Sequence, residues 1–271
     1  MLVGGAHPTV MAPLETFLIS RFLVFTLVLA RIGALVMTAP LFGTQALPRH
    51  VRALLAVAMS LLVTPVYLGT SLPPVGQVVD YGRLLVNEAL VGLLLGLGMN
   101  ILFSGIQVAG QIVSQMSGLS LADVFNPGIE EDVSVFSQLF YFLTLAVFVA
   151  VGGHRLIMEA LLESFAAAPP GQAWLGQNFV DVLTSITTQS FALGIRAAAP
   201  LLTALLLSNL VLGLISRTLP QINVIAVGFG VNSLLALGLL SVSLGAAAYT
   251  FQNPTIDVLQ QIGATIDSVS K

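Results

Sequence analysis

Three charged residues lie inside long apolar stretches of the sequence, and they are the first candidates for chemistry: Arg31, Glu88 and Arg196. A charge at the centre of a membrane helix costs about 2.5–3.5 kcal/mol on insertion scales, so such residues often mark an ion or proton path. Proton relays use chains of acidic or histidine side chains, whereas these stretches contain one acid and no histidine well inside them. The alternative is a structural pair such as Arg31–Glu88, or arginine side chains that extend to the membrane interface. We favour the structural interpretation.

The sequence contains no motif typical of catalysis or metal binding. His7, His50 and His154 lie far apart and form no metal-ligand spacing. There is no cysteine, no phosphate-binding GxxxxGK[ST] motif and no GxSxG nucleophile motif. We therefore expect no metal, no cofactor and no enzymatic activity.

The composition is typical of a protein embedded in lipid. The chain is 56% hydrophobic and 8% charged, whereas soluble domains carry roughly 25% charged residues. Its net charge is -3 and its basic residues are scattered, which argues against a nucleic-acid partner. We predict a single membrane domain over 1–271, with a front helical part at about 17–215 and a C-terminal part with a helical hairpin at about 216–265.

Long apolar stretches predict an all-α, polytopic membrane protein, because a helix needs about 20 residues to cross a bilayer. Six stretches are apparent, at about 17–40, 53–68, 84–108, 133–152, 182–215 and 224–250. The fifth would reach about 51 Å as one straight helix. Pro200 lies within it and is expected to kink or break it.

Glycine and serine mark two further features of the third stretch and its continuation. Gly92 and Gly96 form a GxxxG pair, a spacing that permits close helix packing but is common in membrane helices. The segment Ala109–Asn126 is too apolar for a solvated loop and too rich in Gly, Ser and Gln for a lipid-facing helix. Non-helical backbone at membrane depth persists only where protein or water covers it. The segment is thus either a plug within a pore or, more simply, a loop outside the membrane.

Four motifs resemble the family of the flagellar biosynthetic protein FliR, in order and over about 17–265. They are RIGALVMTAPLFGTQALPRHVR (Arg31–Arg52), AGQIVSQMSGLSLADVFNP (Ala109–Pro127), GGHRLIMEALLESF (Gly152–Phe165) and SRTLPQINVIAVGF (Ser216–Phe229). They look more flagellar than virulence-type. Met1–Pro13 matches no motif of the family.

The resemblance implies a structural and gating subunit of the flagellar type III protein export gate. Such a subunit assembles with two smaller membrane subunits into a helical, pore-bearing complex that passes unfolded protein substrates. Other export-apparatus proteins supply the energy. The expected location is the bacterial inner membrane, at the base of the flagellar basal body.

The resemblance also implies roles for particular residues. A plug that closes the idle pore would include Gly110, Gln111, Met116, Gly118, Leu119, Ser120, Leu121 and Phe125. Contacts with partner subunits would involve Arg31, Pro40, Pro48, Arg52, Glu88 and Arg196. The tight turn of the last hairpin, expected on the cytoplasmic side, would contain Arg217, Pro220, Gln221 and Asn223.

Two other functions fit the composition. A small-molecule permease would need broken helices in matching halves and a polar site at mid-depth, but only the fifth stretch contains an obvious break. An anchor subunit of another membrane complex would explain the hydrophobicity but not the segment Ala109–Asn126. The positive charges of the loops divide evenly between the two sides, so charge alone sets no orientation.

Overall fold

The computed structural model describes residues 13–42, 47–69, 78–119, 134–173, 178–219, 221, 223 and 226–242. These residues form helices joined by turns, and the described part of the chain contains no strand. The elements are α1 (Pro13–Thr38), α2 (Arg49–Val63), the short 3-10 helix η1 (Thr64–Tyr67), α3 (Val78–Ser117), α5 (Val135–Ala150), α6 (Gly153–Ala167), α7 (Asn178–Thr218) and a last helix, Ala226–Val242.

Several of these helices are long and apolar enough to cross a membrane. Four qualify by themselves, namely Leu18–Thr38, Arg49–Tyr67, Val78–Ser117 and Val180–Thr218. Helices α5 and α6 qualify only as a pair, bent by 68°. Ala226–Val242 is apolar but shorter. The predicted all-α polytopic membrane architecture is confirmed.

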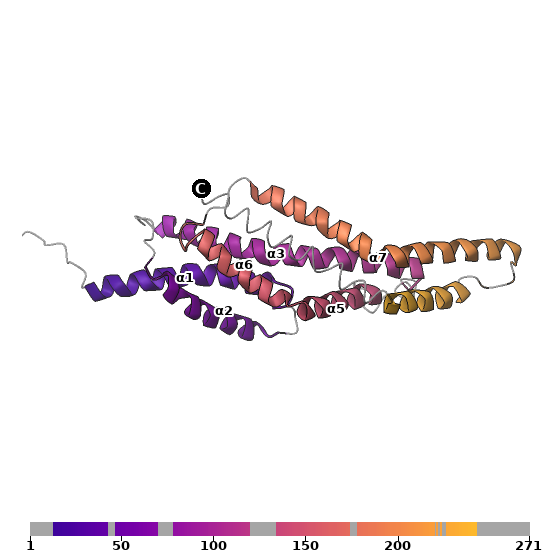
Figure 1. Ribbon diagram of the computed structural model, residues 1–271, viewed down its shortest axis with the longest axis horizontal. Coiled ribbons are helices and arrows are strands. Elements are labelled where there is room, and N and C mark those ends of the chain that lie inside the picture. Colours follow the sequence, from indigo (N-terminus) through magenta and orange to yellow (C-terminus); the bar gives the residue numbers. More distant parts are fainter. Residues whose placement is uncertain are drawn as a thin grey trace, which may run out of the picture.

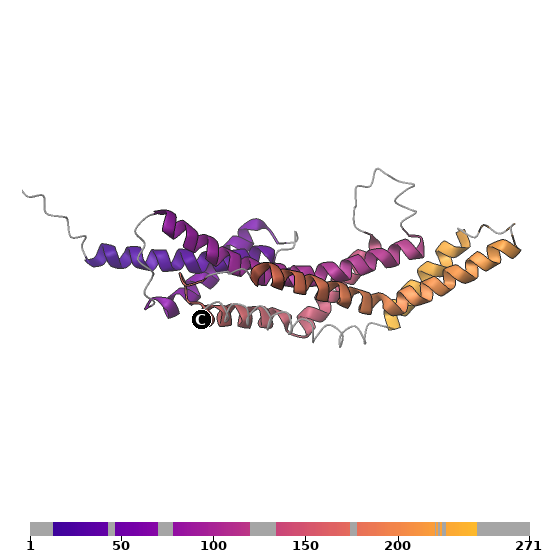
Figure 2. The same ribbon diagram turned by 90° about the horizontal axis from the view of Figure 1, so that it is seen from above.

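Helix α3 is the axis of an elongated body (Figures 1 and 2). It packs against α1, α5 and α7. Helices α1 and α7 run in the same direction as α3, whereas α5 and α6 return along it. The second half of α7 and the helix Ala226–Val242 form an antiparallel hairpin at one end of the body.

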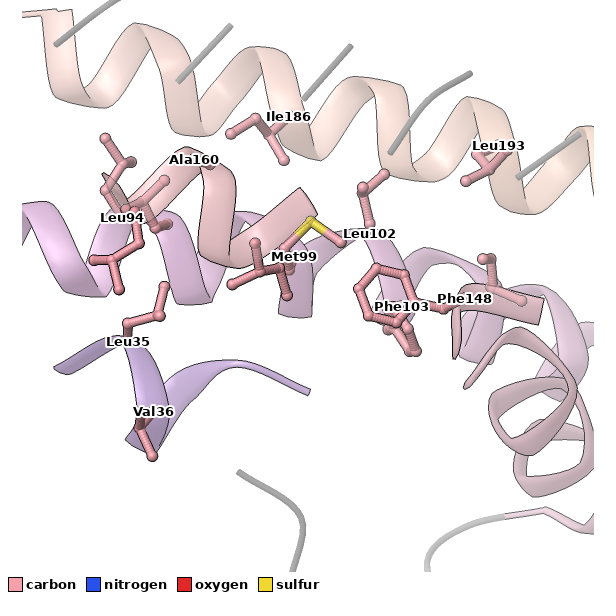
Figure 3. Close-up of a cluster of buried hydrophobic side chains, with 14 of the residues drawn as sticks. Leu35, Val36, Leu94, Met99, Leu102, Phe103, Phe148, Ala160, Ile186 and Leu193 are labelled. Atoms are coloured by element: carbon pink, nitrogen blue, oxygen red, sulfur yellow. The ribbon is translucent and has the colours of Figure 1, made fainter. Parts of the chain in front are cut away.

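Apolar side chains of α1, α5, α6 and α7 meet those of α3 in the core (Figure 3). Met99 and Leu94 of α3 are completely buried, as is Leu35 of α1. Phe103 of α3 meets Phe148 of α5 edge-on, with ring centroids 5.5 Å apart and an interplanar angle of 80°. Aromatic rings prefer such edge-to-face contacts, which hold α5 in a fixed register on α3.

Glycines of α3 set how closely its neighbours approach. A Cβ atom on Gly92 would collide with the Arg31 carbonyl of α1, and one on Gly96 would collide with Thr38. The GxxxG pair therefore marks the contact between α1 and α3. Gly105 has the same role toward α7, where a Cβ atom would collide with Ser190.

Two sequence predictions differ from the structure in detail, and a third, which left a kink or a break open at Pro200, is decided by it. Helix α3 continues to Ser117, so residues 109–117 are helical and not a loop. Helix α6 was missed as a separate element, because its sequence GHRLIMEALLESFAA carries His154 and three charged residues and so forms no long apolar stretch. The backbone turns between α5 and α6 at Gly152, which has a φ of +82°. Helix α7 remains continuous through Pro200 but changes direction near its middle (Figure 1), so the proline bends the helix and does not break it.

Candidate functional site

Arg31 and Glu88 form a buried ion pair between α1 and α3. The Arg31 Nε donates to the Glu88 Oε2 at 2.7 Å, and neither side chain is exposed to solvent. The predicted structural pairing of these two charges is confirmed. The geometry of the α1–α3 contact explains it, because Gly92 lies one turn beyond Glu88 and lets the two helices approach.

The pair also fixes α6 and the turn that follows it. The Arg31 guanidinium donates to the Ser164 carbonyl at 2.8 Å and to the Ala168 carbonyl at 2.9 Å. The same guanidinium lies 4.2 Å above the Phe165 ring centroid. The second Glu88 oxygen accepts from the backbone N–H of Gly171 at 2.8 Å. The cluster thus joins four segments that are far apart in the sequence.

The hydrogen bonds of this cluster suit a structural role. Both Glu88 oxygens accept hydrogen bonds from groups of the chain itself, and the side chain is fully buried. The chain itself encloses both side chains, whereas we expected partner subunits to cover them. Removing either charge would leave the other buried without its counter-charge.

The predicted plug residues divide between the end of α3 and residues that the structure does not describe. Gly110, Gln111 and Met116 are helical. Ser120, Leu121 and Phe125 lie outside the described residues. A Cβ atom on Gly110 would lie 2.8 Å from the Phe136 carbonyl of α5, so this glycine permits the close packing of α3 and α5.

Gly118 ends α3 in the manner typical of a helix C-terminus. Its φ is +83°, a conformation that glycine adopts without steric cost. The last four carbonyls of a helix have no partner within the helix, and here several find one nearby. The Ser117 hydroxyl donates to the Ser114 carbonyl at 2.9 Å, and the Gly118 N–H donates to the Gln115 carbonyl at 3.2 Å. Leu119 follows and packs against the core.

The carbonyl of Met116 is capped by a residue that sequence analysis overlooked. The Asn209 amide of α7 donates to it at 3.1 Å, across 93 positions of sequence. Asn209 in turn accepts from Asn232 of the last helix at 2.7 Å. The sequence did show both asparagines within apolar stretches, where an amide needs a partner, but no motif indicated that they contact each other.

The remaining residues predicted to contact partners differ in exposure. Pro40 is buried and its carbonyl accepts from the Tyr141 hydroxyl at 3.4 Å. Pro48 is exposed just before α2, and Arg52 is half-buried in its first turn. Arg196 is exposed on α7, within an otherwise apolar surface.

The predicted hairpin-turn residues lie between α7 and the last helix. Arg217 is in the last turn of α7, where a positive charge interacts favourably with the negative end of the helix dipole. Gln221 is exposed, and Pro220 lies outside the described residues. Asn223 caps the next helix, because its Oδ1 accepts from the Ala226 N–H at 3.2 Å.

In the parts of the chain that the structure describes, no group of three or more His, Cys, Asp or Glu side chains is placed to hold a metal ion. The fold and the site define a polytopic helical membrane protein with a buried charge cluster and a capped central helix.

Comparison with known proteins identifies the family. Residues 22–256 match the family described as bacterial export proteins, family 1. The flagellar biosynthetic protein FliR of Caulobacter vibrioides is 31% identical over 225 residues, which cover 83% of this chain and 90% of that protein. FliR of Aquifex aeolicus is 31% identical over 239 residues, covering 88% and 90%. FliR of Escherichia coli is 29% identical over 213 residues, covering 79% and 81%. The chain belongs to the FliR family, as its four motifs predicted.

Proposed function

We propose that the chain is a structural and gating subunit of a flagellar type III protein export gate, forming part of the pore that passes unfolded substrates. Family membership supports the export role. The observation that carries the gating role is the end of α3. This central helix ends at Ser117, directly before Gly118 and the rest of the predicted plug, and Asn209 of α7 caps its last turn.

Exposed apolar surface supports assembly with other membrane subunits. Only 17% of the apolar stretch of α7 is buried inside the chain, against 61% of that of α3. Arg196 is exposed on this surface, and among the described residues it has no hydrogen bond or ion pair. A bare arginine facing lipid is costly. We infer that protein from two smaller membrane subunits covers this face, and that lipid covers the outer helices.

Family membership also supports the location of the subunit, and the proposal includes no catalytic step. The subunit resides in the bacterial inner membrane, at the base of the flagellar basal body, among other export-apparatus proteins. It needs no cofactor, because its part is to line and close a passage. The hairpin turn at Gln221 and Asn223 faces the cytoplasm.

Shortening the proposed plug tests its gating role. Deleting 116–120 in the assembled complex should leave assembly intact and raise the membrane conductance to small ions. Gly118→Val should instead reduce secretion, because a β-branched residue strains a φ of +83°. Gly82→Val is the matched control, since Gly82 lies near the start of α3 and an added Cβ atom there meets nothing within 4 Å. If the shortened variant assembles, exports normally and conducts no better than the unaltered chain, the segment is only a loop.

A further inference from the structure

A line of hydrogen bonds connects the last hairpin to the end of α3. The Ser208 hydroxyl donates to the Asn232 Oδ1 at 2.6 Å. The Asn232 Nδ2 donates to the Asn209 Oδ1 at 2.7 Å, and the Asn209 Nδ2 donates to the Met116 carbonyl at 3.1 Å. Asn232 of the last helix thus accepts from one residue of α7 and donates to the next, and Asn209 donates onward to α3.

The three elements that carry this line meet at one end of the body. Both views show the carboxyl end of α3 beside the second half of α7 and the last helix (Figures 1 and 2). Gly228 lies against Leu212, where an added Cβ atom would be 3.1 Å from a side-chain methyl group. The helices of the hairpin therefore pack closely just beside the asparagines.

These hydrogen bonds matter for stability because one of the asparagines is buried. Asn232 is only 4% exposed, and the surrounding hairpin surface is apolar. Buried amide groups without partners are destabilising, so Asn232 favours the arrangement in which it meets Asn209 and Ser208. Asn209, which is exposed on α7, transmits this preference to the Met116 carbonyl.

We propose that Asn209 and Asn232 are positioning residues of the gate, forming a latch that keeps the last turn of α3 helical while the hairpin is in place. Movement of the hairpin separates Asn209 from Met116, and the end of α3 then unwinds toward Gly118. The latch rests on the proposed function, because its purpose is to couple the hairpin to the plug. It assigns the control of the plug to residues outside the plug itself.

Hydrogen–deuterium exchange on the full-length chain in its assembled complex tests the latch. Asn209→Leu removes the amide that caps Met116 and keeps a side chain of similar size. The amides of residues 116–119 should then exchange about threefold to tenfold faster, the change expected for one lost hydrogen bond. Asn209→Gln, which retains the amide donor, should restore part of the protection. Asn232→Leu is a second variant that breaks the line from its other side.

Two controls lie on the same helices. Thr203→Val and Ser241→Ala each remove an exposed hydroxyl that bonds only within its own helix. Neither should change exchange at 116–119.

Conductance measured on the same samples separates the latch from the plug. Faster exchange together with higher idle conductance in Asn209→Leu supports the proposal. Unchanged exchange at 116–119 in both leucine variants overturns it. Faster exchange without a rise in conductance also overturns it. In that case the 116–120 deletion shows what has failed: if the deletion conducts, only the latch is wrong, and if it does not, the proposed gate is wrong as well.

Discussion

Neutralising Glu88 is the sharpest test of the interior of this protein. Glu88→Gln preserves the size of the side chain and removes its charge, so Arg31 remains fully buried without a counter-charge. The charge-assisted bond at 2.7 Å becomes a weaker bond to a neutral amide. We expect a loss of about 3 kcal/mol in the free energy of unfolding, the lower end of the range for breaking a buried pair. The lower end applies because Arg31 keeps the Ser164 and Ala168 carbonyls.

Replacing both charged residues by apolar ones should lower the free energy of unfolding by less than the sum of the two single replacements. Arg31→Met with Glu88→Leu removes the stranded charge, which is the main cost of either single change. It also removes the side-chain partner of three buried backbone groups. The Ser164 carbonyl keeps its bond from the Ala168 N–H, whereas the Ala168 carbonyl and the Gly171 N–H lose the partner that Arg31 or Glu88 provides. At about 1–3 kcal/mol for each group, the double variant stays less stable than the unaltered chain.

Unfolding in mixed detergent micelles, followed by circular dichroism, gives the four free energies of this double-mutant cycle. Arg155→Ala is the control, because Arg155 and Glu159 form an exposed pair at 3.3 Å. Such a pair contributes about 0.3–0.5 kcal/mol. If Glu88→Gln is no more destabilising than Arg155→Ala, or if the two single losses simply add, the buried cluster is not an energetic unit.

Three further predictions concern packing, capping and topology. Gly92→Ala should destabilise the chain by about 1–3 kcal/mol in the same assay, because its methyl group would collide with the Arg31 carbonyl; Gly33→Ala, with open space around it, should not destabilise it. Ser134→Ala should cost about 1 kcal/mol, because Ser134 caps α5 by accepting from the Ser137 N–H; Ser241→Ala is its control. Because the chain has no cysteine, Asn223→Cys introduces a single thiol. An impermeant maleimide should label this thiol from the cytoplasmic side. Labelling from the periplasm alone would reverse the proposed orientation.

The sequence by itself determined the membrane class, the main helices and the family. Lipid selects continuous apolar helices whatever their tertiary neighbours, so the stretches around α1, α2, α3 and α7 were predictable. The pairing of Arg31 with Glu88 was also predictable, because two opposite charges in apolar stretches have few other ways to reduce the cost of burial. The four motifs cover most of the chain and led to the FliR family, which the comparisons confirm.

Helix boundaries and long-range hydrogen bonds depended on the tertiary structure. The sequence prediction ended α3 too early, because Gly110 and the serines after it suggest a loop. In the structure the segment is helical, since α5 packs against Gly110 and the Ser117 hydroxyl bonds to the Ser114 carbonyl. Arg31 meets Ser164 across 133 positions, and Asn209 meets Met116 across 93. Local patterns show which side chains need a partner, but only the path of the chain decides which segment provides it.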